Sequence, residues 1–393
     1  MSNRISRRTT LARAAAGAAV IGFGNVGSFG DDDANSLKPP TESSWASFRN
    51  GAAQRGIAGT KLAETSEHKW EFESKDGWVA TSAIVGDHVY APALEGYLYC
   101  LDRSTGEVIW KYRSIESKDE KEFAAGFKAA PLVTAKAVYV GDEDGMLHAV
   151  DRKTGQKQWT FPTGAEIAGG VAKYNDNLLL ASHDRILYCL DEGGDEQWNF
   201  PTDDMINCSP AVAEHFTFVS GCDQMLRVID LETGEEVRHV EMTSPLIASP
   251  AVAGDMLYVG THAGDFVAVN WKMGEIVWRY EGDRQLPYHA SAAVTDDLVI
   301  VGNHDKLLHA IDRKTGKARW TFPTQRRVES SAAVAGNRVF FGSGDGNMYG
   351  VSLEGKAVWK YNAGKSITCG IAIGEGCIVA GEDDRNGKLH CFG

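Results

Sequence analysis

The chain has 393 residues, and its 43% hydrophobic and 24% charged residues are ordinary for a soluble globular protein. Its formal net charge of −13 at pH 7 argues against a nucleic-acid partner, because binding a polyphosphate needs a basic surface. The body of the chain contains no run of about 18 or more apolar residues, so no transmembrane span is expected in the mature chain.

Residues 1–30 have the features of an export signal. Arg7 and Arg8 precede a short, weakly hydrophobic stretch that is rich in Ala and Gly. The segment resembles a twin-arginine signal peptide, which an export receptor reads, whereas the alternative is a disordered basic tail. No cysteine follows the apolar stretch, so a lipid anchor is not expected. We therefore expect an exported protein that is periplasmic or associated with the cell envelope.

From about residue 80 the chain repeats one pattern of small residues, an apolar run, a turn, Leu-x-Ala-x-Asp, Thr-Gly and a tryptophan. The aligned tryptophan positions recur at intervals of 39 to 49 residues. These positions are Trp110, Trp159, Trp198, Val237, Trp278, Trp320 and Trp359. A period near 40 residues with several short strands in each repeat predicts a β-propeller.

Each repeat divides into four predicted strands. In the second copy they are residues 129–133, 137–140, 146–150 and 156–161, where apolar residues alternate in short runs. The intervening segments 141–145 and 151–155 are rich in Asp and Gly, which favour tight turns. The pattern therefore predicts an all-β fold.

The last repeat, residues 368–393, supplies only three strands. Residues 68–72 have the pattern of the missing outer strand, with a Trp followed two residues later by a Phe. We therefore predict that this N-terminal strand completes the last blade and closes a ring of eight four-stranded blades over residues 68–393. Closure hides sheet edges that would otherwise promote aggregation.

The run from Ala149 to Trp159 fits the motif A-x-D-x-x-x-G-x-x-x-W, and the run from Ala310 to Trp320 fits it as well. This motif resembles the tryptophan-docking motif of the PQQ-like propeller family. The resemblance implies a structural framework in which Trp packs between blades while Asp and Gly hold a hairpin. The residues expected in this role are Asp102, Gly106, Trp110, Asp151, Gly155, Trp159, Trp198, Trp278, Asp312, Gly316, Trp320 and Trp359.

Upstream of the ring, residues 31–67 form a lead-in. Trp45 to Asn50, followed by Gly56, resemble the W-x-x-F-R-G sequence found before other exported propellers of this family, although Asn50 replaces the usual Gly. We expect the lead-in to pack on the ring, and a plain linker is the alternative.

Two branches of the family imply different functions. Quinoprotein alcohol and sugar dehydrogenases bind PQQ and calcium in the central funnel, whereas BamB-like propellers bind proteins and have no known cofactor. Repeats of about 40 residues leave little chain for a lid or a pocket, and the sequence has no adjacent Cys-Cys pair. We therefore predict a monomeric, non-catalytic scaffold without a cofactor that binds a protein partner in cell-envelope or outer-membrane protein assembly. A small PQQ-dependent dehydrogenase is the alternative.

Four polar residues are predicted to share one mouth of the central channel because they precede the innermost strands of their blades. They are Lys128, Asn207, His289 and Glu329. His289 and Glu329 come from neighbouring blades and are expected to pair. The group is either a ligand or cation site or a solvated polar rim.

The turn after the second strand carries His183, Cys222, His262 and His304 on four successive blades. Histidine and cysteine are ligands for soft metals. These turns are expected to lie too far apart to share an ion, so no metal site is predicted.

The seven cysteines are expected to be buried, unpaired residues because repeat-equivalent positions lie on different blades. The one sizeable insertion, residues 115–126, is highly charged and is either a solvated loop or a partner contact.

Overall fold

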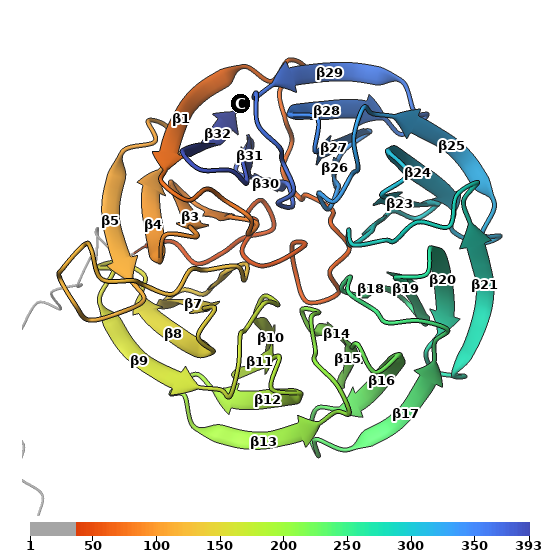
Figure 1. The fold of residues 1–393 in the computed structure, drawn as a ribbon, viewed down its shortest axis with the longest axis horizontal. Coiled ribbons are helices and arrows are strands. Elements are labelled where there is room, and N and C mark those ends of the chain that lie inside the picture. The colour runs from red at the N-terminus through yellow and green to blue at the C-terminus, as the bar shows by residue number, and fades with distance from the viewer. Residues whose placement is uncertain (1–36) are drawn as a thin grey trace, which may run out of the picture. The chain divides into compact units, whose positions relative to one another are not determined.

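The structure is a computed structural model that describes residues 37–393. Within this range 32 strands form eight sheets of four antiparallel strands, arranged as blades around one axis (Figure 1). The predicted eight-bladed propeller is therefore confirmed. The predicted signal peptide, with Arg7 and Arg8, lies outside the described residues. No helix between residues 37 and 393 is long and apolar enough to cross a membrane.

The strands run from the axis outwards in each blade. Blade 1 contains β2 (Ala83–Val85), β3 (His88–Pro92), β4 (Tyr97–Asp102) and β5 (Val108–Arg113), and blade 2 contains β6 (Leu132–Val133), β7 (Ala137–Gly141), β8 (Met146–Asp151) and β9 (Lys157–Pro162). Blade 3 contains β10 (Ala172–Tyr174), β11 (Asn177–Ala181), β12 (Ile186–Asp191) and β13 (Glu196–Pro201). Blade 4 contains β14 (Ala211–Ala213), β15 (Phe216–Ser220), β16 (Met225–Asp230) and β17 (Glu236–Glu241). Blade 5 contains β18 (Ala251–Ala253), β19 (Met256–Gly260), β20 (Asp265–Asn270) and β21 (Glu275–Glu281), and blade 6 contains β22 (Ala293–Val294), β23 (Leu298–Gly302), β24 (Leu307–Asp312) and β25 (Ala318–Pro323). Blade 7 contains β26 (Ala333–Ala335), β27 (Arg338–Gly342), β28 (Asn347–Ser352) and β29 (Ala357–Asn362). Blade 8 contains β30 (Ala372–Gly374), β31 (Cys377–Gly381), β32 (Gly387–Phe392) and β1 (His68–Ser74).

Burial differs between the middle and outer strands of a blade. The two middle strands of blade 2, β7 and β8, are buried almost throughout, whereas β9 alternates between half-buried and exposed residues. The middle strands are covered on both faces by neighbouring blades, which explains their continuous apolar runs. One face of the outer strand is exposed to solvent, so its side chains alternate between half-buried and exposed.

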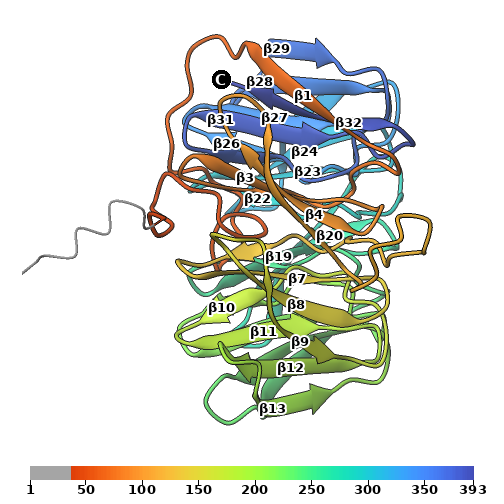
Figure 2. The same ribbon diagram turned by 90° about the vertical axis from the view of Figure 1, so that its left-hand side faces the viewer.

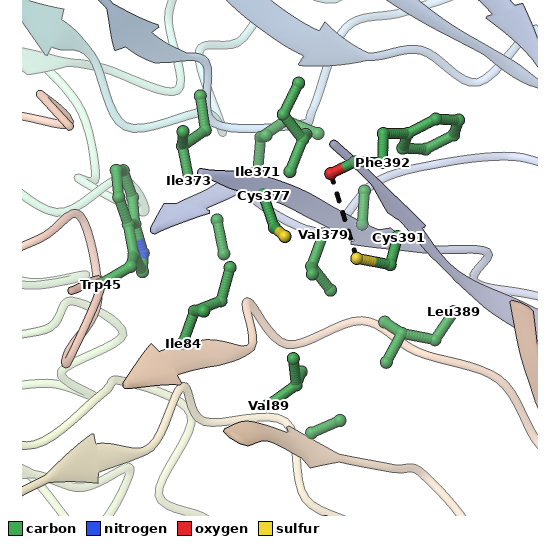
Figure 3. Close-up of a cluster of buried hydrophobic side chains, with 14 of the residues drawn as sticks. Trp45, Ile84, Val89, Ile371, Ile373, Cys377, Val379, Leu389, Cys391 and Phe392 are labelled. Atoms are coloured by element: carbon green, nitrogen blue, oxygen red, sulfur yellow. Dashed lines mark hydrogen bonds between the residues drawn. The ribbon is translucent and has the colours of Figure 1, made fainter. Parts of the chain in front are cut away.

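The ring closes between the two ends of the folded domain, as predicted. β1 pairs antiparallel with β32, with Phe72 opposite Leu389. Beside this closure a buried apolar cluster includes Ile84 from blade 1 and Val379 from blade 8, and Trp45 of the lead-in joins it (Figure 3). The lead-in is therefore part of the hydrophobic core at the closure.

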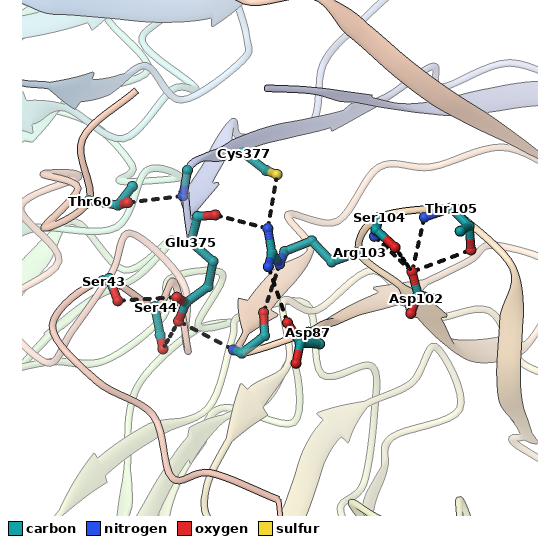
Figure 4. A network of polar contacts seen from close by, with 12 residues as sticks. Ser43, Ser44, Thr60, Asp87, Asp102, Arg103, Ser104, Thr105, Glu375 and Cys377 are labelled. Carbon is teal, nitrogen blue, oxygen red and sulfur yellow. Dashed lines mark hydrogen bonds and ion pairs between the residues drawn. The ribbon is translucent and has the colours of Figure 1, made fainter. Parts of the chain in front are cut away.

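A polar network reinforces the same closure (Figure 4). The Glu375 carboxylate accepts hydrogen bonds from the Ser43 and Ser44 hydroxyls, at 3.1 and 2.7 Å, and from the Gly86 amide at 3.2 Å. The Arg103 guanidinium donates to the carbonyl oxygens of Gly86 and Glu375, at 2.8 and 3.0 Å. These contacts tie blade 8, blade 1 and the lead-in together.

The lead-in then winds across the centre of the ring (Figure 1). Its carbonyl oxygens accept hydrogen bonds from the inner strands of successive blades. These bonds run from Val133 to Ala46, from Val212 to Ala52, from Val252 to Ala53, from Val294 to Arg55 and from Val334 to Gly56, each at 2.8 or 2.9 Å. Residues 41–60 therefore form an inner turn that packs on the ring and closes one end of its central channel.

The two faces of the ring consequently differ (Figure 2). The closed face carries the lead-in, and it also carries the hairpins that join the third and fourth strands of blades 1 to 7. The open face carries the turns between second and third strands and the connections from blade to blade. The insertion between blades 1 and 2, residues 115–126, projects from the open face and is called the projecting loop below.

Candidate functional site

The residues of the docking motif lie on the closed face and join each blade to the next. The Trp110 indole Nε1 donates to the Arg152 carbonyl oxygen of blade 2 at 3.1 Å. Gly155 has a φ of 71°, and a Cβ at this position would lie 2.7 Å from the Trp110 ring. The Asp151 carboxylate accepts hydrogen bonds from the amides of Lys153 and Thr154 and so holds the same hairpin.

This arrangement repeats around the ring. At each of the other docking positions the tryptophan Nε1 donates a hydrogen bond to a carbonyl oxygen outside its own blade. The pairs that join one blade to the next are Trp70 to Arg103, Trp159 to Glu192, Trp198 to Leu231, Trp278 to Arg313 and Trp320 to Leu353. Trp359 donates instead to Ser66 of the lead-in. Asp102 and Asp312 accept amide hydrogen bonds in their hairpins as Asp151 does, and Gly106 and Gly316 lie against Trp70 and Trp278. These residues hold the blades together.

Blade 4 departs from the sequence alignment by one residue. Strand pairing places Arg238 opposite Val228, where the other blades have their tryptophan, so the assignment of Val237 to this position was wrong. The Arg238 guanidinium donates to the Trp271 carbonyl oxygen at 3.3 Å, and its stem lies against Gly274. An arginine thus supplies both the donor and the flat apolar contact of a tryptophan. The one-residue offset hid this substitution in the sequence.

The open end of the channel is a ring of eight equivalent positions, one from each blade. They are Val79, Lys128, Ala168, Asn207, Ile247, His289, Glu329 and Thr368, and all line one cavity of about 180 Å³. The four predicted mouth residues therefore do share one mouth. In blades 1 and 3 the equivalent positions are Val79 and Ala168, whereas Ile167, one residue earlier, is fully buried against Gly141.

Below the mouth the channel is narrow. Hydroxyl side chains from blades 4 to 7 link neighbouring inner strands, because Ser209, Ser249, Ser291 and Ser331 each accept a hydrogen bond at 2.8–3.0 Å from the backbone amide of the preceding blade. Phe48 of the lead-in forms the floor. The cavity is smaller than the roughly 300–1,000 Å³ of typical small-molecule sites.

On one side of the mouth, a lysine forms ion pairs with two glutamates. The Lys128 ammonium lies 2.7 Å from Glu143 and 3.4 Å from Glu166. Burial by itself would lower the pKa of Lys128, but hydrogen bonding and charge attraction from the two carboxylates raise it above the ordinary value. This lysine is therefore charged and already neutralised.

The opposite arc gathers histidines. Glu329 Oε1 lies 2.8 Å from His304 Nε2 and 3.6 Å from His289 Nδ1. Burial and the neighbouring His289 lower the pKa of His304. Burial alone would raise the pKa of Glu329, but the hydrogen bond from His289 and the charge of Arg327 lower it below the ordinary value.

Two of the four turn residues reach the channel mouth. His262 Nδ1 lies 3.4 Å from His289 Nε2, and the His304 and His289 ring centroids lie 4.4 Å apart. That the four turns lie too far from one another to share an ion stays a prediction. The same turn position on blade 4 places Cys222 beside Asn207, at 3.0 Å. The recurrence of histidine at one repeat position was the available signal.

A family model described as the outer membrane protein assembly factor BamB matches residues 56–171, 143–287 and 274–382. The chain belongs to this family. Its fold is similar to the crystal structure of BamB from Moraxella catarrhalis, with a TM-score of 0.69 and 17% identity over 84% of this chain and 97% of that chain. No curated protein has a significant sequence match to it.

The BamB-family fold is shared with enzymes. The quinohemoprotein alcohol dehydrogenase ADHIIG from Pseudomonas putida HK5 aligns with a TM-score of 0.74 and 15% identity, and the enzyme from Comamonas testosteroni with 0.74 and 13%. Each alignment covers 89% of this chain and 80% of the enzyme. Identities this low show a common fold alone.

The channel residues of this BamB-family propeller do not fit PQQ. PQQ carries three carboxylates and requires basic groups to bind them. Lys128 is the one lysine or arginine among the residues that line the described channel, and Glu143 and Glu166 already neutralise it. A cavity of about 180 Å³ with a phenylalanine floor also leaves little room for a tricyclic ring.

The projecting loop lies at the outer edge of the ring, beside β5 and β9 (Figure 1). Arg113 holds its shape, because the guanidinium donates to the carbonyl oxygens of Ser117, Asp119 and Glu122 at 2.6–2.8 Å. Phe123 at its far end is 74% exposed. Two clefts of about 510 and 560 Å³ flank the loop and share Tyr97 and Lys111 in their walls.

Proposed function

We propose that this protein is an exported, non-catalytic propeller that binds a protein partner on its open face, with the projecting loop as the main contact. The observation that carries the proposal is a loop that Arg113 holds through three hydrogen bonds and that presents an exposed phenylalanine in the wall of one of its two flanking clefts. A large apolar side chain held in place by backbone-directed hydrogen bonds costs little conformational entropy when a partner covers it.

The chemistry of the loop resembles that of a protein-binding hot spot. Binding energy at interfaces concentrates in a few aromatic and arginine side chains surrounded by a polar rim. Phe123 supplies the aromatic group, and charged loop residues including Glu120 and Lys121 surround it. The clefts on either side offer room for side chains of a partner.

The place of action that we propose is the cell envelope. The family model is named for an outer-membrane protein assembly factor, and the sequence begins with a segment that resembles a twin-arginine signal peptide. A monomeric ring that docks an unfolded or assembling envelope protein is consistent with both observations. No cofactor is required for this role.

The proposal is tested by quantitative affinity capture from the producing cells with three forms of the protein. We compare the wild type with Phe123→Ser on the open face and with Met273→Ser on the closed face, where Met273 is 63% exposed. A partner that is retained by wild type and Met273→Ser but lost with Phe123→Ser supports the proposal. Equal retention by all three forms would contradict it.

The dehydrogenase alternative has its own test. A ligand that binds only the folded state raises the melting temperature, by about 2.7 kcal/mol of stabilisation at a hundredfold excess over its dissociation constant. We expect no shift with PQQ and calcium and no dye-linked oxidation of alcohols or aldoses. A clear shift with turnover would replace the scaffold by an enzyme.

A further inference from the structure

The histidine arc of the channel mouth brings metal-ligating atoms together from two blades. His289 and His304 belong to blade 6, one before its innermost strand and one in the turn after its second strand, and Glu329 precedes the innermost strand of blade 7. Their ligand atoms all lie within 4.8 Å of one another. The two imidazole rings meet at 67° with centroids 4.4 Å apart, so they do not stack face to face.

Two nitrogens and one carboxylate oxygen at this spacing suit a transition-metal ion. Zinc binds imidazole nitrogen and carboxylate oxygen at about 2.0–2.2 Å, which separates ligands in a tetrahedral site by roughly 3.3 Å. The distances from Glu329 Oε1 to His304 Nε2 and His289 Nδ1, 2.8 and 3.6 Å, bracket that separation. Small rotations about side-chain bonds would place all three around one ion.

In His289 and Glu329, the polar atom that does not face the ligand cluster is itself held by a neighbouring side chain, as is usual for metal ligands. His262 Nδ1 lies 3.4 Å from His289 Nε2, with the rings stacked at 17°. Arg327 Nε donates to Glu329 Oε2 at 2.9 Å and leaves Oε1 directed at the histidines. Hydrogen bonds to the outer atom of a ligand fix its orientation and tautomer, and they are typical of metal sites.

The other cluster of this kind within residues 37–393 is less suited to an ion. It consists of His68, Glu71 and His390, and His68 and Glu71 are exposed. Glu71 already forms an ion pair with Lys388, and His390 is held by Glu382 at 3.2 Å. Two of its three side chains are exposed and the third is already held by a carboxylate, so this cluster serves as the natural control.

We propose that the open mouth of the channel binds a zinc ion through His289 Nδ1, His304 Nε2 and Glu329 Oε1. The three side chains are 29%, 18% and 16% exposed, so the ion is reachable from solvent. Three protein ligands leave at least one coordination position for water or for a donor group of a bound molecule. The site is independent of the projecting loop.

The test is a zinc titration of the chelator-treated full-length protein by calorimetry, with Co²⁺ as a spectroscopic probe. We expect one equivalent of zinc and an intense visible Co²⁺ band. His304→Asn and Glu329→Gln should each abolish the band and weaken zinc binding at least about tenfold, and His262→Asn should weaken it by about tenfold or more through loss of positioning.

The control variant is His68→Asn, which should bind zinc as the wild type does. Unchanged melting temperatures establish that each variant is folded. The proposal is overturned if the wild type shows no saturable zinc binding, if His304→Asn and Glu329→Gln both bind unchanged, or if His68→Asn alone loses the ion.

Discussion

The two faces of the ring are built from the same repeats but differ in what they contact. On the closed face the lead-in bonds to the inner strands, and the docking tryptophans bond to the next blade. On the open face the mouth residues, the histidine arc and the projecting loop project towards solvent. The comparison indicates that one face holds the ring together while the other is free to bind.

The largest loss of stability is expected when the packing of the lead-in on the closed face is disrupted. Trp45 is fully buried and packs in the core beside the ring closure. Trp45→Ala should lower the free energy of unfolding by about 3–5 kcal/mol, because it leaves a cavity in that core. Urea unfolding measures the loss.

Phe123→Ala on the open face is the matched control for this experiment. Its side chain is mostly exposed, so the free energy of unfolding should change by no more than about 0.5 kcal/mol. Comparable losses in the two variants would show that the faces are not divided in this way.

A smaller effect is expected at the joints between blades. Trp110→Ala removes a buried ring and its hydrogen bond to Arg152, and should cost about 3 kcal/mol. Arg238→Ala removes a half-exposed arginine from the equivalent joint of blade 4 and should cost about 1 kcal/mol. Thermal unfolding of the two variants measures both losses of stability. Equal losses would mean that Arg238 stabilises its joint as much as a tryptophan does.

A pH dependence is expected on the closed face at Cys377. The thiol lies 3.6 Å from Arg103 Nη1 (Figure 4). It also lies 3.8 Å from Lys69 Nζ. A hydrogen bond with Cys391, and then these two cations, lower the pKa of Cys377 below its ordinary value. The thiolate therefore stabilises the folded protein fully above the unfolded pKa, near 8.5, and this stability is lost as pH falls through the lower folded pKa.

The measurement is the free energy of unfolding of wild type relative to Cys377→Ala between pH 9 and pH 6. The difference should shrink as pH falls. Cys189→Ala is the control, since burial raises the pKa of Cys189 and its difference should stay constant from pH 6 to pH 8. A flat profile for Cys377→Ala would contradict the assignment of a thiolate at this position.

Among the polar positions, only a small effect on stability is expected at the open mouth. Glu329→Gln keeps the shape of the side chain in a solvent-reachable position, so the free energy of unfolding at pH 7 should change by no more than about 1 kcal/mol. Chemical denaturation checks this value, and a loss as large as that of Trp45→Ala would make the histidine arc a structural element.

The sequence predicted the repeating parts of the molecule well because repetition is visible in one dimension. The 40-residue period and the outer strand at residues 68–72 were enough to derive eight blades and their closure. The alignment failed by one residue at Arg238, where the repeat lacks its tryptophan and nothing local fixes the register.

The contacts at the mouth were harder to predict because they depend on side-chain reach between blades. His304 lies in a turn, and its distance from Glu329 follows from the radius of the ring and the direction of the side chain rather than from spacing in the sequence. The path of the lead-in was similarly hidden, since its hydrogen bonds use backbone groups that no residue type reveals.

The most direct test of the division between faces is photo-crosslinking in the producing cells. A benzophenone amino acid is placed at position 123 on the open face or at position 273 on the closed face, two positions with similar exposure in the wild type, 74% and 63%. The account predicts a discrete crosslinked partner from position 123 and none from position 273. A partner crosslinked from position 273 alone would contradict it and assign binding to the closed face.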